Sequence, residues 1–128
     1  MTDTMQNFVK SKMVLVECNT SVLEAYQLMK KNNIRHLPVV KDGQAVGIIS
    51  DRDVQFMGHG GDSLNLKAED IMTKDLLSVD AQTTIPHVVQ LMSNKKISSV
   101  IINGDDKKIE GIFTSTDALD LLFQSYKV

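Results

Sequence analysis

The order of apolar and polar positions along the chain predicts the same series of elements in each half: strand, helix, hairpin, helix. The first helix has apolar residues at spacings of three and four, which places them on one face, and Asn19, Thr20 or Ser21 can cap it. The hairpin strands are short β-rich runs on either side of the turn at residues 41–44. The predicted first-half elements are a strand at residues 13–17, a helix that includes residues 22–29 and ends near residues 32–33, strands at 37–40 and 45–49, and a helix at 51–57.

The second half repeats this series. Thr83 or Thr84 can cap its first helix, and Pro86 is tolerated in the first turn because the missing N–H has no partner there. Its buried face is predicted to contain Val88, Val89, Leu91 and Met92. The predicted second-half elements are a strand at residues 76–80, a helix that starts after Thr83 or Thr84 and includes residues 88–92, strands at 99–102 and 109–113, and a helix at 115–123.

The two halves are an internal repeat, which fixes the architecture before any single residue is interpreted. The segment 47–53, GIISDRD, returns at 111–117 as GIFTSTD. Equivalent positions before these segments, such as Ile34 and Ile97, are 63 residues apart, whereas the segments themselves are 64 apart. The second half therefore has one additional residue between Ile97 and Gly111, most simply in the turn at 103–106. The predicted organisation is repeat 1 at 8–57, a linker at 58–68 that begins with the Gly-rich stretch 58–63, and repeat 2 at 69–124.

Composition narrows the functional classes. The chain has 128 residues, 42% hydrophobic and 23% charged, which is typical of a globular protein with one core. A net charge of −2 and the absence of Trp argue against nucleic-acid binding. No apolar run is long enough to span a bilayer and no signal peptide is evident, so no membrane association and a cytoplasmic location are expected. Cys18 is the only cysteine, and His59 and His87 lack a second ligand at metal-like spacing, so neither a disulfide nor a metal site is expected.

The acidic motif that closes each repeat carries the candidate chemistry. Asp53 and Asp117 each follow a Ser or Thr by three positions, at the predicted start of a helix. A carboxylate there can accept hydrogen bonds from two ribose hydroxyls, and free N–H groups at a helix start favour phosphate. The same spacing also fits a variant of the helix capping box, which would serve stability alone. Both interpretations remain open at this stage.

The chain resembles the tandem CBS-domain pair, also called a Bateman module. The resemblance rests on residues 34–40, IRHLPVV, and 46–54, VGIISDRDV, with a weaker second copy at 97–102 and 111–118. It also rests on Asp70-Ile71-Met72-Thr73, which looks like the entry segment that precedes a CBS repeat. The resemblance implies an α/β (α+β) fold in which two pseudo-symmetric repeats pack through their sheets into one disc-like module with two clefts.

In ligand-binding members of this family the adenine lies against the start of the first hairpin strand of one repeat, and the acidic motif of the other holds the ribose. One cleft would then combine Ile34, Arg35 and His36 with Thr114, Thr116 and Asp117. The other would combine Ile97, Ser98 and Ser99 with Ser50, Arg52 and Asp53. Arg52 can supply a positive charge to a phosphate, whereas Thr116 cannot, which slightly favours the Asp53 cleft for a nucleotide. Arg35 and His36 offer positive charge in the Asp117 cleft instead, so both clefts stay open as nucleotide sites.

The resemblance implies a regulatory module that binds AMP, ADP, ATP or S-adenosylmethionine and signals to an unknown partner protein. The alternative is a ligand-free dimerisation or protein-interaction module. No enzymatic activity is expected, because neither a nucleophile elbow nor a phosphate-binding loop with its lysine is present, and no cofactor is required. By analogy with the family, a homodimer is expected through the helix faces around residues 22–29, 54–57 and 88–92.

Overall fold

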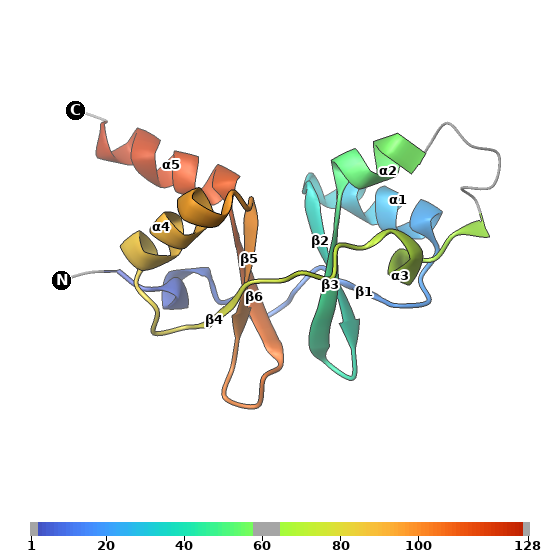
Figure 1. The fold of residues 1–128 in the computed structure, drawn as a ribbon, viewed down its shortest axis with the longest axis horizontal. Helices are drawn as coiled ribbons and strands as arrows, with labels where there is room; N and C mark the ends of the chain where they lie inside the picture. The colour runs from blue at the N-terminus through green and yellow to red at the C-terminus, as the bar shows by residue number, and fades with distance from the viewer. Residues whose placement is uncertain (1–2, 58–64, 127–128) are drawn as a thin grey trace. The chain divides into compact units, whose positions relative to one another are not determined.

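The computed structural model describes residues 3–57 and 65–126, and it contains two three-stranded sheets with flanking helices (Figure 1). In each sheet the first strand is parallel to the second, and the second and third form an antiparallel hairpin. The sheets are ordered β1-β2-β3 and β4-β5-β6. The elements are η1 (Met5–Phe8, a 3-10 helix), β1 (Val16–Glu17), α1 (Val22–Asn32), β2 (His36–Lys41), β3 (Gln44–Ser50), α2 (Asp51–Met57), α3 (Ala68–Ile71), β4 (Ser78–Asp80), α4 (Ile85–Lys95), β5 (Ser99–Asn103), β6 (Ile109–Thr114) and α5 (Ser115–Ser125).

The predicted series of elements is confirmed, and so is the α/β class. The side chains of Ser21 and Thr84 cap α1 and α4, as expected from their positions. The predicted strand at 13–17 is shorter than expected, because only Val16 and Glu17 pair with β2. Val89 was wrongly placed on the buried face of α4: it is 37% exposed, whereas Val88 is fully buried. The Gly-rich stretch 58–63 lies outside the described residues.

The hairpin turns account for the residue added in the second repeat. The first turn is short, with Asp42 and Gly43 both at positive φ (54° and 81°), the conformation that lets a tight turn follow the twist of its strands. The second turn is longer and occupies residues 104–108, between the end of β5 and the start of β6. A surface turn absorbs an insertion without disturbing the flanking ladder.

The compact units of the structure do not coincide with the sequence repeats. One unit comprises Lys12–Leu76, and the other combines the N-terminal segment up to Ser11 with the chain from Leu77 onward. We call these the first-repeat unit and the second-repeat unit. In Figure 1 the blue N-terminal segment accordingly lies with β6 and α4. Each repeat is therefore completed by a segment that precedes the other repeat in the sequence.

Backbone hydrogen bonds fix both exchanged segments. In the second-repeat unit the amide of Met5 donates to the carbonyl of Thr83 at 2.8 Å, and that of Lys10 donates to Glu110 at 2.9 Å. In the first-repeat unit the amide of Ala68 donates to the carbonyl of Thr20 at 2.7 Å. Thr73 forms an isolated antiparallel bridge with Ile48, and Val9 forms the equivalent bridge with Gly111. The two segments thus occupy corresponding places on the two hairpins.

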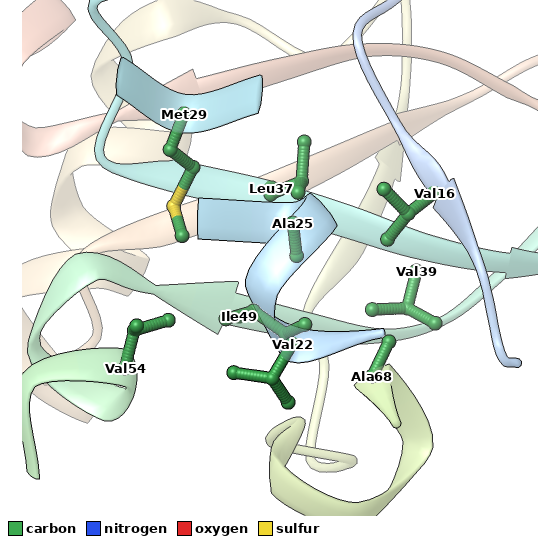
Figure 2. Packing of buried hydrophobic residues seen from close by; sticks show 9 residues of the cluster. All are labelled: Val16, Val22, Ala25, Met29, Leu37, Val39, Ile49, Val54 and Ala68. Atoms are coloured by element: carbon green, nitrogen blue, oxygen red, sulfur yellow. The ribbon is translucent and has the colours of Figure 1, made fainter. Parts of the chain in front are cut away.

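Each unit has its own apolar core. In the first-repeat unit, residues from α1 pack over the β2-β3 hairpin, and fully buried Ala68 of α3 joins the same cluster. Figure 2 shows this cluster, which consists of Val16, Val22, Ala25, Met29, Leu37, Val39, Ile49, Val54 and Ala68. In the second-repeat unit Met5 is fully buried with Val88 and Phe113. Phe8 meets Phe113 edge to face, with ring centroids 4.7 Å apart and planes at 79°.

The close approach of the N-terminal segment explains the glycine that opens the second acidic motif. A Cβ at Gly111 would lie 2.5 Å from the carbonyl oxygen of Phe8 and 3.2 Å from the Cδ1 atom of Ile102. A backbone atom cannot move aside as a side chain can, so a larger residue would displace the exchanged segment. Gly111, which is equivalent to Gly47 of the first repeat, therefore has a packing role.

Candidate functional site

The start of the first hairpin strand lies beside the acidic motif of the same repeat. In the first-repeat unit, His36 pairs with Ser50 across the β2-β3 ladder. The amide of Asp51 donates to the carbonyl of Arg35 at 2.9 Å. Arg35 and the residues that precede Asp53 are therefore neighbours at one edge. We call this group the first-repeat site: Ile34, Arg35, His36, Ser50, Arg52 and Asp53.

The second-repeat unit has the equivalent arrangement. Ser99 pairs with Thr114 across the β5-β6 ladder, and the amide of Ser115 donates to the carbonyl of Ser98 at 2.9 Å. The strand start and the acidic motif again meet within one repeat. We call this group the second-repeat site: Ile97, Ser98, Ser99, Thr114, Thr116 and Asp117. All the residues predicted from the sequence therefore gather at the two equivalent edges.

Both acidic motifs form the capping box that the sequence allowed. Asp53 Oδ2 accepts from the Ser50 amide at 2.9 Å, and Ser50 Oγ accepts from the Asp53 amide at 3.1 Å. Asp117 Oδ2 accepts from the Thr114 amide at 2.8 Å, and Thr114 Oγ1 accepts from the Asp117 amide at 3.4 Å. The Thr114 hydroxyl also donates to Asp117 Oδ2, at 3.1 Å. The capping interpretation is confirmed for both repeats.

The cap uses only one oxygen of each carboxylate. Every hydrogen bond that the carboxylates of Asp53 and Asp117 accept ends on Oδ2, and Oδ1 of each has no hydrogen-bond partner within the described chain. Both side chains are half-buried, so Oδ1 is held in place by the cap while remaining able to accept further bonds. Capping and ligand binding are therefore compatible roles for one carboxylate.

The two sites differ in their positively charged side chains. Arg35 and Arg52 are exposed, and no ion pair engages them within the described residues. The equivalent residues of the second-repeat site are Ser98 and Thr116, which are also exposed. The first-repeat site can thus offer two guanidinium groups to an anion, and the second-repeat site offers hydroxyl groups at the same positions.

Neither a metal-binding group nor a membrane-spanning helix is present in the part of the chain that the structure describes. No group of three His, Cys, Asp or Glu residues there could hold a metal ion. None of its helices has the length and apolar character needed to cross a membrane. Cys18 is half-buried, and its thiol lies 3.7 Å from the carbonyl oxygen of Val40.

A second surface feature lies between α4 and α5 of the second-repeat unit. A cavity of about 590 Å³ has an apolar lining that includes Ile85, Val89, Ala118 and Leu122. At and next to this cavity, α5 and its C-cap residue expose large apolar side chains at spacings of three and four, a pattern that is present in the sequence but outside the predicted dimer faces. We call this set the α5 stripe: Leu119 (63% exposed), Leu122 (52%), Phe123 (69%) and Tyr126 (78%).

The predicted dimer faces need correction in part, because most of their apolar residues are internal. Val22, Met29, Val54, Val88 and Met92 are buried in the cores of their own units. From the same segments, Leu23 (47% exposed) and Val89 (37%) remain accessible. The large apolar side chains that remain exposed are therefore these two residues and the α5 stripe, and not the buried faces.

Comparison with known proteins supports this architecture. The CBS domain family profile matches residues 6–56 and again residues 68–124. The solved CBS domain pair of protein MJ0100, in complex with 5′-methylthioadenosine and S-adenosyl-L-methionine, is 30% identical with a TM-score of 0.83, and the match covers 99% of this chain and 100% of that one. CBSX2 in complex with AMP is 25% identical with a TM-score of 0.81, and the match covers 98% and 99% of the two chains.

Curated relatives include much longer proteins. An inosine-5′-monophosphate dehydrogenase of Korarchaeum cryptofilum is 31% identical over 112 residues, which is 88% of this chain and 23% of the relative. An L-aspartate semialdehyde sulfurtransferase of Methanocaldococcus jannaschii is 32% identical over 106 residues, which is 81% of this chain and 20% of the relative. The chain thus spans less than a quarter of the length of either enzyme. The two matches to the family profile and the two equivalent units show that the chain belongs to the CBS domain family and is a tandem CBS pair.

Proposed function

We propose that this chain is a regulatory module that binds an adenosine-containing ligand, of the AMP, ADP, ATP or S-adenosylmethionine class. The observation that carries the proposal is the Oδ1 atom of Asp53 and of Asp117, which the capping box holds in place without using it. Support comes from the CBS pairs in complex with 5′-methylthioadenosine and S-adenosyl-L-methionine, and with AMP, which share this fold over nearly their whole length.

The arrangement within one repeat suits the parts of such a ligand. Oδ1 of Asp53 accepts hydrogen bonds from the ribose hydroxyls, which are strengthened by its charge. The backbone of Ile34 and Arg35, at the start of β2, recognises the adenine edge, so the side chains there are free to differ between repeats. Since His36 and Ser50 pair directly, we propose that the strand start and the acidic motif of one repeat contribute to the same site.

The signal would pass through the exchanged segments to a partner protein. The chain crosses from one unit to the other between Ser11 and Lys12 and again between Leu76 and Leu77. A ligand that stabilises one arrangement of a unit also restrains the segment that completes the other unit. The free energy of ligand binding in one unit is then coupled to the conformational free energy of the other.

We propose no catalytic activity for the chain, because the residues at both sites are used for capping and ligand contacts.

The proposal is tested by isothermal titration of the whole chain with AMP, ADP, ATP and S-adenosylmethionine. We expect micromolar affinity, about −8 kcal/mol, for at least one ligand, and its loss in Asp53→Ala or Asp117→Ala. Asp120→Ala is the matched control, because Asp120 is an exposed carboxylate on α5 outside both sites. Circular dichroism verifies that each variant is folded. Absence of heat with all four ligands, from folded protein, would contradict the proposal.

A second candidate function, homodimerisation, is favoured by the α5 stripe. Residues 119, 122, 123 and 126 follow the spacing of one helix face. A twofold dimer places the same face of both copies together, so a second copy of the chain, which offers an equally apolar face, is the proposed occupant. Burying Leu122 and Phe123 would remove from water two of the large apolar side chains that the chain exposes.

Sedimentation velocity over a range of concentrations tests this second candidate. We expect a dimer whose dissociation constant rises about 30-fold or more in Leu122→Asp, as for the loss of an interface anchor worth about 2 kcal/mol. Gln124→Asp, which adds the same charge to exposed helix surface, should leave the dimer intact. A parent chain that sediments as a monomer at every concentration would exclude dimerisation through the stripe.

A further inference from the structure

The two sites share one backbone arrangement but differ systematically in charge. Repeat equivalence aligns Arg35 with Ser98 and Arg52 with Thr116, while the carboxylates Asp53 and Asp117 are common to both. Each arginine of the first-repeat site is thus replaced by a short hydroxyl residue in the second-repeat site. A ligand bound in the same pose would meet different electrostatics in the two repeats.

The two arginines of the first repeat belong to segments that meet at its acidic motif. Arg35 precedes β2, Arg52 is in the first turn of α2, and the hydrogen bond of 2.9 Å from the Asp51 amide to the Arg35 carbonyl brings these segments together. Both side chains are exposed and outside any ion pair within the described residues, so no internal partner has to be displaced. Planar guanidinium groups donate in pairs to phosphate oxygens, which suits them to a phosphate monoester.

The second repeat has cations nearby in sequence, but they are placed differently. Lys95 is in the last turn of α4 and Lys96 is its C-cap, where positive charge complements the helix dipole. No lysine or arginine adjoins Thr116 or Asp117 in sequence. No sequence neighbour of Asp117 therefore offsets the repulsion between its carboxylate and a phosphate, whereas Arg52 adjoins Asp53 in the first repeat.

We infer that the two repeats select ligands of different charge. The first-repeat site takes an adenosine ligand with a 5′-phosphate, and the second-repeat site takes an adenosine ligand whose 5′ substituent carries no negative charge. This inference rests on the proposed function and deepens it. If the carboxylate holds the 2′ and 3′ hydroxyls, the 5′ carbon lies on the other side of the ribose. In the first repeat the long side chains of Arg35 and Arg52 then reach the 5′ substituent. In the second repeat the equivalent residues, Ser98 and Thr116, carry short hydroxyl side chains.

The test compares AMP with 5′-methylthioadenosine, which has an uncharged thioether in place of the phosphate. Both are titrated into the whole chain and into the double variant Arg35→Gln/Arg52→Gln. We expect the affinity for AMP to fall at least about tenfold, as for the loss of charge-assisted hydrogen bonds, while the affinity for 5′-methylthioadenosine changes less than about twofold. Lys30→Gln/Lys31→Gln, which removes two exposed charges at the end of α1, is the matched control.

Two further variants assign each ligand to a repeat. Asp53→Ala is expected to abolish binding of AMP alone, and Asp117→Ala binding of 5′-methylthioadenosine alone. In the reverse direction, Thr116→Arg is expected to add measurable AMP binding in an Asp53→Ala background. Arg35, Arg52 and Thr116 are exposed, so their substitutions leave the cores intact. Circular dichroism verifies that the two aspartate variants, which also lose a helix cap, are folded.

The outcomes separate this inference from the proposed function. AMP binding that is insensitive to the arginine variant, or that is lost in Asp117→Ala, would overturn the inference while leaving ligand binding established. Loss of both ligands through the same aspartate would also overturn it. If neither ligand binds the folded parent chain, the proposed function fails, and the inference with it.

Discussion

Replacing Met5 with alanine is expected to lower the free energy of unfolding of the second-repeat unit by about 2–5 kcal/mol. Met5 is fully buried and belongs to the same cluster as Val88, Val100 and Phe113, although it precedes them in the sequence by most of the chain. Truncation would leave a cavity beneath η1, and the loss combines removed apolar contacts with the cost of that cavity. Denaturation by urea measures it directly.

Gln6→Ala is the matched control, because Gln6 lies in the same short 3-10 helix with an exposed side chain. Its effect should stay within about 0.5 kcal/mol. Hydrogen exchange adds a local measurement: in Met5→Ala, amides of α4 and β5 should exchange faster while those of α1 and β2 change little. If Met5→Ala and Gln6→Ala had equal effects, the N-terminal segment would not be part of this core.

Repetition made most of the fold predictable from the sequence. Helical spacing and caps at Ser21 and Thr84 located α1 and α4, and β-rich runs around turn residues located both hairpins. The exchange of segments was not predictable. The short helices η1 and α3 have four residues each, which is too few to show a helical period in the sequence. Tertiary contacts, such as those of Met5 and Ala68 with the two cores, decide where these helices pack.

The candidate sites were predictable as a set of residues but not as geometry. The spacing of Ser50 and Asp53 predicted a capping box, which is present, but it could not tell which carboxylate oxygen the cap would use. The pairing of His36 with Ser50 follows from the hairpin register, which the sequence defined only approximately. Which apolar side chains of α5 are exposed depends on the face that packs against the core, and the sequence does not define this face. In the structure no residue of α5 is fully buried.

The Asp53→Asn variant is expected to reduce affinity for the first-repeat ligand by about 10-fold to 100-fold while preserving most of the stability. The asparagine carbonyl can still accept the Ser50 amide that Asp53 Oδ2 accepts at 2.9 Å, so the cap persists. The second position becomes an NH₂ group, which donates and cannot accept from ribose hydroxyls, so charge-assisted bonds worth about 1.5–3 kcal/mol are lost. Isothermal titration and urea denaturation measure the two quantities on the same protein.

Asp53→Ala removes both roles and should therefore lose about 1 kcal/mol of stability in addition to the affinity. Asp80→Asn is the matched control. Asp80 also holds a local turn, because its Oδ1 accepts from the Gln82 amide at 2.9 Å. It lies outside both sites, because it pairs with Asn103, at the opposite end of β5 from Ser99. It should leave affinity unchanged. If Asp53→Asn bound ligand as tightly as the parent chain, the carboxylate would be a helix cap alone, and the ribose contact would have to be sought on other residues of the site.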